Sequence, residues 1–179
     1  MNELMNQILA CGAQKAAVIR REDIEYDLIF REICKSNACG AYGTCHMCPP
    51  DVGPAEELIA HAKRFAGGVL YQNVYPLEDS FDYEGMVDAR RAHHACSARI
   101  QQQLTGNVLH LSVGGCGVCE RCAKKDGEPC RFPEKALPSL EAYCMNVHRT
   151  AENAGLKYIN GENTVTYFGL VLTGEDIDA

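Results

Sequence analysis

The sequence predicts an α/β domain, with a mixed α+β arrangement as the alternative, in which a small central sheet is flanked by helices. Segments rich in apolar and β-branched residues alternate with segments of helical periodicity. The chain has 179 residues, which is enough for one sizeable hydrophobic core. No tandem repeat or linker-like stretch divides it. We therefore expect one compact domain over residues 1–179, with two cysteine-rich loops.

The first half of the chain predicts three helices and two strands. They are a helix over Asn2 to Cys11, a strand over Ala16 to Arg20, a helix over Asp27 to Lys35, a helix opened by Pro54, and a strand over Val69 to Tyr75. Glu56 and Glu57 lie in the first turn after Pro54, where they suit the helix dipole. Gly67 is expected to end that helix.

The second half predicts two further helices and two strands. They are a long helix over about Glu84 to Leu104, a strand over Val108 to Val113, a helix from Ser139 to Gly155, and a strand over Thr164 to Thr173. Ser139 is a favourable N-cap residue, and Leu140, Tyr143 and Val147 follow it at helical spacing. The last strand is the clearest, because Val, Thr, Tyr and Phe dominate it.

Composition excludes several classes of protein. The net charge of −7 disfavours nucleic acid as a partner, because phosphate binding needs a basic surface. An acidic chain is compatible with a basic protein partner. No apolar stretch approaches the roughly 20 residues that cross a bilayer, so we expect no membrane association. The segment from Met1 to Ala10 lacks the pattern of a signal peptide, and the expected location is the cytoplasm.

Eleven cysteines in a reducing compartment require an explanation, because disulfides are rare there. Eight of them fall into two dense groups, and the odd total argues against a complete disulfide framework. Metal ligation explains the grouping better, with a disulfide framework as the weaker alternative. Each group lies among glycines and prolines, where the backbone can bend to aim several sulfurs at one point.

The second group has the spacing Cys116-x2-Cys119-x2-Cys122-x7-Cys130. Three thiols at every third residue cannot pair with one another without strain, but they can occupy three corners of an iron–sulfur cluster. The more distant Cys130 would take the fourth corner, or would ligate a different cluster as in two-cluster ferredoxins. Structural zinc is the alternative for this group.

The first group has the spacing Cys34-x4-Cys39-x5-Cys45-x2-Cys48. It predicts a second cluster, held either by all four thiols or by only three of them. Three ligands would leave an iron open to a small molecule. His46 lies between two of these cysteines, and an exposed loop histidine is the preferred interpretation over a ligand.

The remaining candidate residues have ordinary explanations. We expect the thiols of Cys11, Cys96 and Cys144 to behave as small hydrophobic groups in or beside helices. His93 and His94 are adjacent on a helix, so they cannot both face one metal; solvent exposure or one core contact is expected. The sequence contains no phosphate-binding loop, dinucleotide fingerprint or hydrolase motif, and no catalytic residue is predicted.

Several of these segments together resemble one family. They are Cys39-Gly-Ala-Tyr-Gly43 leading to Cys48-Pro-Pro50, the cysteines from Cys116 to Cys122, Pro129-Cys-Arg-Phe-Pro133, and Ser139-Leu-Glu-Ala-Tyr143. The chain is similar, over about residues 15–173, to the cysteine-rich predicted metal-binding proteins of the domain of unknown function 2284, common in anaerobes. The resemblance implies metal or iron–sulfur binding in one α/β domain and brings no known reaction. The family pattern includes a cysteine at position 34, does not require one at Cys45, and usually has glycine at Cys144.

Three hypotheses follow from these observations. The leading one is a cytoplasmic, oxygen-sensitive protein with one or two [4Fe–4S] clusters that transfers single electrons to a redox partner. The second is a cluster-dependent enzyme or sensor with an open iron near Cys34 to Cys48 that binds a small molecule. The third is a zinc-stabilised interaction module without a redox role.

Overall fold

Four antiparallel strands form one sheet at the centre of the molecule, in the order β1-β2-β4-β3. The computed structural model describes residues 1–175. The strands are β1 (Lys15–Arg20), β2 (Phe65–Pro76), β3 (Val108–Leu111) and β4 (Thr164–Glu175). The helices are α1 (Asn2–Ala10), α2 (Ile29–Lys35), α3 (Ala55–Ala62), α4 (Tyr83–Gln103) and α5 (Val147–Asn153), with 3-10 turns η1 (Arg21–Asp23), η2 (Ala123–Asp126) and η3 (Glu141–Tyr143). The predicted fold class is confirmed, and the antiparallel sheet gives it the mixed α+β form.

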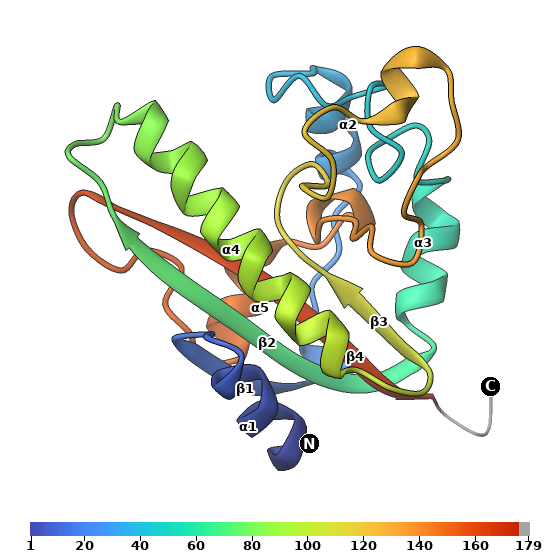
Figure 1. The fold of residues 1–179 in the computed structure, drawn as a ribbon. Coiled ribbons are helices and arrows are strands. Elements are labelled where there is room, and N and C mark those ends of the chain that lie inside the picture. Colours follow the sequence, from blue (N-terminus) through green and yellow to red (C-terminus); the bar gives the residue numbers. More distant parts are fainter. Residues whose placement is uncertain (176–179) are drawn as a thin grey trace.

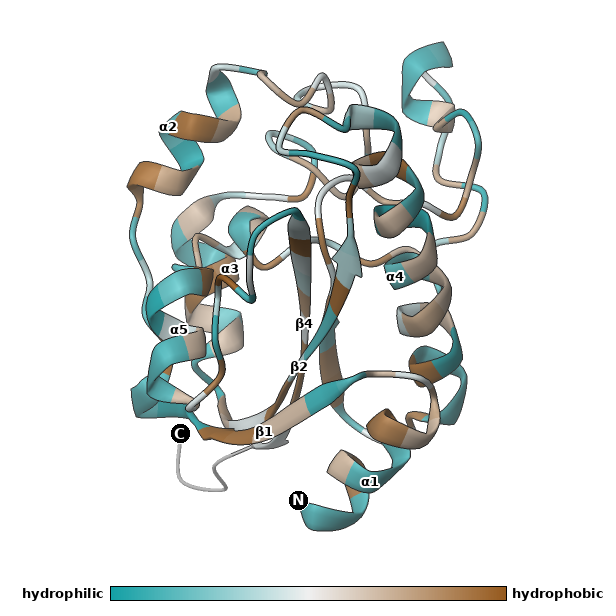
Figure 2. Cartoon of the chain, turned by 90° about the vertical axis from the view of Figure 1, so that its left-hand side faces the viewer, coloured by the Kyte–Doolittle hydropathy of each residue, from teal (hydrophilic) through white to brown (hydrophobic). Residues whose placement is uncertain are grey.

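Helices cover both faces of the sheet (Figures 1 and 2). On one face, Leu70 and Leu170 pack with side chains from α3 and α5 in the larger core cluster. On the other face, Val69, Tyr71 and Val171 pack with α1 and α4. Successive strand residues point to opposite faces, so β2 is buried along most of its length. Within residues 1–175, no helix combines the length and the hydropathy needed to span a bilayer.

The helix after Pro54 ends earlier than the sequence predicts. α3 stops at Ala62, β2 begins at Phe65, and Gly67 lies inside the strand, where it pairs with β1 and β4. The prediction that Gly67 ends the helix is therefore wrong. A Cβ at Gly67 would lie 2.5 Å from the carbonyl oxygen of Ile19, so this glycine allows close approach of a neighbouring strand.

The predicted helix from Ser139 to Gly155 is broken. The Ser139 hydroxyl accepts a hydrogen bond from the amide of Ala142 at 3.1 Å, but it caps only the short turn η3. Cys144 then adopts a left-handed conformation with φ of 58°, which no helix can continue through. A new helix, α5, starts with Asn146 as its N-cap and ends, as predicted, before Gly155.

A buried chain of polar side chains joins α4 to the sheet. The Tyr71 hydroxyl lies 2.8 Å from both the Ser97 hydroxyl and Nε2 of His110. Nδ1 of His110 lies 2.8 Å from Oε1 of Gln101, which only accepts, so Nδ1 carries the proton and Nε2 accepts from Tyr71. The Ser97 hydroxyl is also 2.9 Å from that of Ser112, the first residue after β3. The network therefore fixes where the chain leaves the sheet.

Glycine makes room for this network on the neighbouring strand. A Cβ at Gly169 would lie 2.1 Å from the ring of Tyr71, so the ring packs over β4 where glycine leaves it room. The ring of His93 stacks on Tyr71 with centroids 5.6 Å apart, and burial lowers the pKa of His93 to about 3. His93 makes the predicted core contact, whereas Nε2 of His94 donates to the carbonyl of Val113 at 2.9 Å.

Replacing Tyr71 with phenylalanine tests the network. We expect the Tyr71→Phe variant to lower the free energy of unfolding by about 1–3 kcal/mol, because it leaves Nε2 of buried His110 without its donor. Tyr83→Phe is the matched control, since the Tyr83 side chain is 73% exposed. Urea unfolding of both variants at equal metal loading measures the difference. Equal stability of the two variants would contradict a structural role for the network.

Candidate metal centre

The two cysteine-rich segments meet at one end of the sheet, and the structure regroups their thiols. Five cysteines line one cavity, here called the first thiol cavity: Cys45, Cys116, Cys119, Cys122 and Cys130. Three line an adjoining one of about 240 Å³, the second thiol cavity: Cys34, Cys39 and Cys48. All eight predicted site residues are thus brought together. Cys45 lines the first thiol cavity together with the cysteines of the later segment. It is thereby separated from Cys34 and Cys39, with which the sequence spacing grouped it.

Glycines shape the segment that carries the later cysteines. Gly114 turns the chain with a φ of 58° directly after β3. A Cβ at Gly117 would lie 2.1 Å from the ring of His94, so only glycine lets the chain pass this close to α4. The turn η2 follows Cys122 and ends at Gly127, whose φ is 74°. These bends return the chain to Cys130 on the same cavity.

Tight turns also shape the earlier segment. Cys34 lies in the last turn of α2, and Asn37 follows with a φ of 55°. The Asn37 side-chain oxygen accepts from the amide of Tyr42 at 3.0 Å, which closes this loop. The amide of Cys48 donates to the carbonyl of Cys45 at 3.0 Å, so the Cys-x2-Cys pair forms one turn.

Polar contacts hold the two segments against each other. Nε2 of His46 donates to the carbonyl of Glu128 at 2.8 Å, and the ammonium of Lys124 contacts the carboxylate of Asp51. His46 is therefore half-buried and held by the opposite loop. This docking places Cys45 in the first thiol cavity.

The Cys45 and Cys48 thiols form the boundary between the cavities. A hydrogen bond from Cys48 lowers the pKa of Cys45, and the backbone amides of Met47 and Cys116 favour its thiolate further. The same bond, together with burial, raises the pKa of Cys48. Burial raises the pKa of Cys116, and a hydrogen bond from the backbone amide of Val118 partly offsets this rise. Backbone amides thus already point at sulfurs, as they do in metal–thiolate sites.

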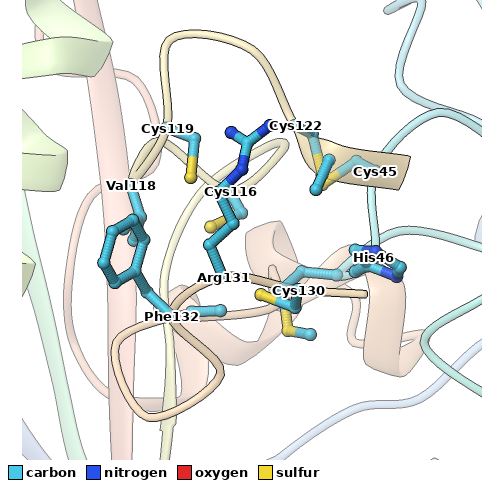
Figure 3. Close-up of a pocket in the computed structure, with 12 residues that line it drawn as sticks. Cys45, His46, Cys116, Val118, Cys119, Cys122, Cys130, Arg131 and Phe132 are labelled. Carbon is cyan, nitrogen blue, oxygen red and sulfur yellow. The ribbon is translucent and has the colours of Figure 1, made fainter. Parts of the chain in front are cut away.

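Figure 3 shows the first thiol cavity, with Val118 and Phe132 forming one wall and Cys45 and His46 on the opposite side. The side chain of Arg131 extends among the sulfurs and donates to the carbonyl of Arg121 at 3.2 Å. About 20 Å³ of free space remains beside it. A cluster would require the exposed Arg131 side chain to swing outward, where it would stay as a nearby cation.

The second thiol cavity contains an acid that the sequence did not single out. Glu141 lines it with Cys34, Cys39 and Cys48, and burial raises the pKa of the Glu141 carboxyl. The Ser139 hydroxyl interacts with this carboxyl. Glu141 belongs to the Ser139-Leu-Glu-Ala-Tyr143 segment that carries the family resemblance, but a single glutamate has no ligand spacing that would mark it as a site residue. Glu141 is the first residue of the turn η3, and the left-handed conformation of Cys144 ends this turn before α5 begins.

The donors of both cavities are mainly cysteine thiols, which bind zinc and iron–sulfur clusters alike. Within residues 1–175, no set of three or more Cys, His, Asp or Glu side chains converges as a single metal ion requires. Sulfurs around one tetrahedral zinc lie roughly 3.8 Å apart, given Zn–S bonds of about 2.3 Å. The thiols of a multi-iron cluster sit on separate corners and are farther apart. The described thiols are therefore not in the arrangement of a closed single-zinc site.

Fold and thiol constellation define a cysteine-rich metal-binding domain. The chain belongs to the DUF2284 family of predicted metal-binding proteins, whose model matches residues 17–173. No curated protein and no solved structure matches the chain. The resemblance seen in the sequence is therefore confirmed, and a bound metal follows from it without its identity.

Serine substitutions test the partition into two cavities. We expect Cys39→Ser to remove metal only from the second thiol cavity and Cys119→Ser only from the first, because each thiol lines one cavity. Elemental analysis and difference absorption spectra measure the loss. Cys11→Ser, at the end of α1, serves as the control and should keep the full metal content. Identical residual spectra for Cys39→Ser and Cys119→Ser would contradict two separate centres.

Proposed function

We propose that this protein binds one or two [4Fe–4S] clusters and transfers single electrons to a redox partner. The observation that carries the proposal is the pair of adjoining thiol cavities, with five and three cysteines. Such clusters, when bound, take up and release one electron at a time. Eight thiols match the number of ligands for two cubane clusters.

Two features of the first thiol cavity support a cluster over a structural zinc ion. Its Cys-x2-Cys-x2-Cys repeat supplies three thiols at the spacing of ferredoxin-type clusters, and either Cys45 or Cys130 can provide the fourth. Arg131 also supplies a positive charge beside the sulfurs. A cation near a cluster stabilises its more negative, reduced form.

The arrangement supplies a route for electrons. Cys45 and Cys48 form the common wall of the two cavities. Gly115 lies against the same wall, because a Cβ built there would lie 3.8 Å from the Cys48 sulfur. Beside Cys34, helix α2 buries none of its own side chains, and Ile29 and Ile33 are more than half exposed. Exposed apolar side chains next to a metal centre suit transient contact with a redox protein.

Anaerobic purification tests the proposal. We expect brown protein with broad absorption near 400 nm, roughly four or eight irons per chain and matching acid-labile sulfide. Reversible one-electron reduction should give an EPR signal. Colourless protein with stoichiometric zinc and an intact fold would contradict the proposal and favour a zinc-stabilised interaction module. Cys119→Ser should lose or convert one cluster.

One observation favours a second function, that of an enzyme or sensor. The second thiol cavity offers three thiols rather than four, and a partly buried carboxyl, Glu141, faces the same space. Three thiolates leave one iron without a cysteine ligand, and such an iron binds a small molecule as a Lewis acid. Glu141 would then serve as an exchangeable oxygen ligand.

Cyanide distinguishes the two functions. On the open-iron hypothesis, cyanide shifts the EPR signal that Cys39→Ser abolishes, and Glu141→Gln strengthens cyanide binding because a competing carboxylate is lost. Glu162→Gln, in an exposed loop, is the matched control. A signal unaffected by cyanide supports electron transfer alone. Loss of the second-centre signal in Cys45→Ser, as in Cys39→Ser, would indicate a fourth cysteine ligand and would contradict the open iron.

A further inference from the structure

A large cavity lies between one side of α4 and residues 112–137. Its volume is about 520 Å³, which is within the usual range for small-molecule sites. Cys116, Val118 and Phe132 line both this cavity and the first thiol cavity. The segment that carries the later cysteines therefore has metal-binding thiols on one side and open space on the other. We call this space the α4 cavity.

The charge of the α4 cavity is opposite to that of the chain. The whole protein carries 24 acidic and 17 basic residues, yet Arg91 and Lys135 line the cavity and none of the carboxylate residues within 1–175 does. Arg91 pairs at 2.8 Å with Asp88, but both side chains are 74% exposed, so solvent screens this pair. The Lys135 ammonium lies 5.3 Å from the ring centroid of Phe132. The lining therefore favours a negatively charged ligand.

The interior of the α4 cavity offers hydrogen-bonding groups of fixed position. Ser97 and Ser112 line it although both residues are almost completely buried, and Gln101 and Gln102 add side-chain amides. The Ser97 hydroxyl is already used by the His93 carbonyl, Tyr71 and Ser112, so the amides are the groups available to a ligand. The buried network that includes Tyr71 and His110 holds the side-chain oxygen of Gln101, which fixes the position of its amide group. Groups held in this way orient a ligand without losing much side-chain entropy on binding.

The remaining wall is apolar. Phe132, Val118 and Leu137 supply it from the cysteine segment, and Ala95 and Ala98 supply it from α4. Phe132 is 40% exposed and Val118 is 39% exposed, so both offer contact area to a ligand. Cations on the rim, polar groups inside and a flat apolar wall together match an organic anion that has an apolar ring or chain.

We propose that the α4 cavity binds a small organic carboxylate in contact with the Cys116 side of the first metal centre. Binding itself does not require a particular metal. A role for the ligand as electron donor, acceptor or effector rests on the proposed iron–sulfur function. The shared residue Cys116 makes the two sites neighbours, so a bound ligand would alter the spectrum of the metal centre.

Benzoate is the probe, used with the anaerobically purified, metal-loaded protein. We expect saturable binding by calorimetry, with roughly tenfold weaker binding of benzamide, its neutral counterpart. Ala98→Trp should abolish binding, because Ala98 is exposed on α4 and a larger side chain fills the cavity without disturbing the core. Benzoate should shift the EPR or visible spectrum of the parent protein and leave that of Ala98→Trp unchanged.

Variants that remove charge from the α4 cavity provide a second test. The double variant Arg91→Gln/Lys135→Gln should bind benzoate roughly tenfold more weakly, whereas Arg149→Gln, on the distant and exposed surface of α5, should bind it normally. Absence of benzoate binding, or equal binding by Ala98→Trp, would overturn the proposal even if the protein holds iron and sulfide. Protein without iron and sulfide that still binds benzoate in the α4 cavity would contradict only the iron–sulfur function.

Discussion

The parallel bridge between Ser112 and Ser139 is the constraint on which both thiol cavities depend. The amide of Ser112 donates to the carbonyl of Pro138 at 2.9 Å, and the amide of Leu140 donates to the carbonyl of Ser112 at 3.2 Å. Each bond contributes only about 0.5–1.5 kcal/mol, but together they close the base of the long cysteine segment. The Ser112 side chain continues into the buried network, and Ser139 caps the turn that carries Glu141. One clamp thus positions both cavities relative to the sheet.

The contact between the two cysteine segments supplies the thiols with donors and cations that neither segment provides alone. A thiolate-rich centre concentrates negative charge, so it needs donors and cations around it. His46 and Lys124 reach across between the segments, and Arg131 extends among the sulfurs. The backbone amides of Met47, Cys116 and Val118 add further donors to the Cys45 and Cys116 sulfurs. The acidic chain therefore surrounds its thiols with positive and hydrogen-bonding groups, although its net charge is −7.

Local signals predicted most of the fold, and tertiary contacts decided the rest. Strand patterns and helix ends placed β2, β4 and α4 because those elements bury regular apolar faces. The sequence could not show that Gly67 serves strand packing, since that role depends on a neighbour more than 40 residues away in the chain. Spacing grouped Cys45 with Cys34, whereas docking of His46 on Glu128 turns it toward the other cavity. Glu141 lies in a segment shared with the family, but nothing in the spacing of that segment indicates that its side chain lines the second thiol cavity.

If the α4 cavity binds a carboxylate and the first metal centre is redox-active, as proposed, the shared residue Cys116 would couple the two sites electrostatically. A bound carboxylate and an electron added to the thiolate centre are both negative charges on opposite sides of one residue, so each disfavours the other. The coupling is reciprocal: if anion binding makes reduction harder, reduction weakens anion binding by the same factor. The Arg91 and Lys135 charges offset part of this repulsion. An organic anion in the α4 cavity would therefore be bound preferentially by the oxidised protein and released on reduction.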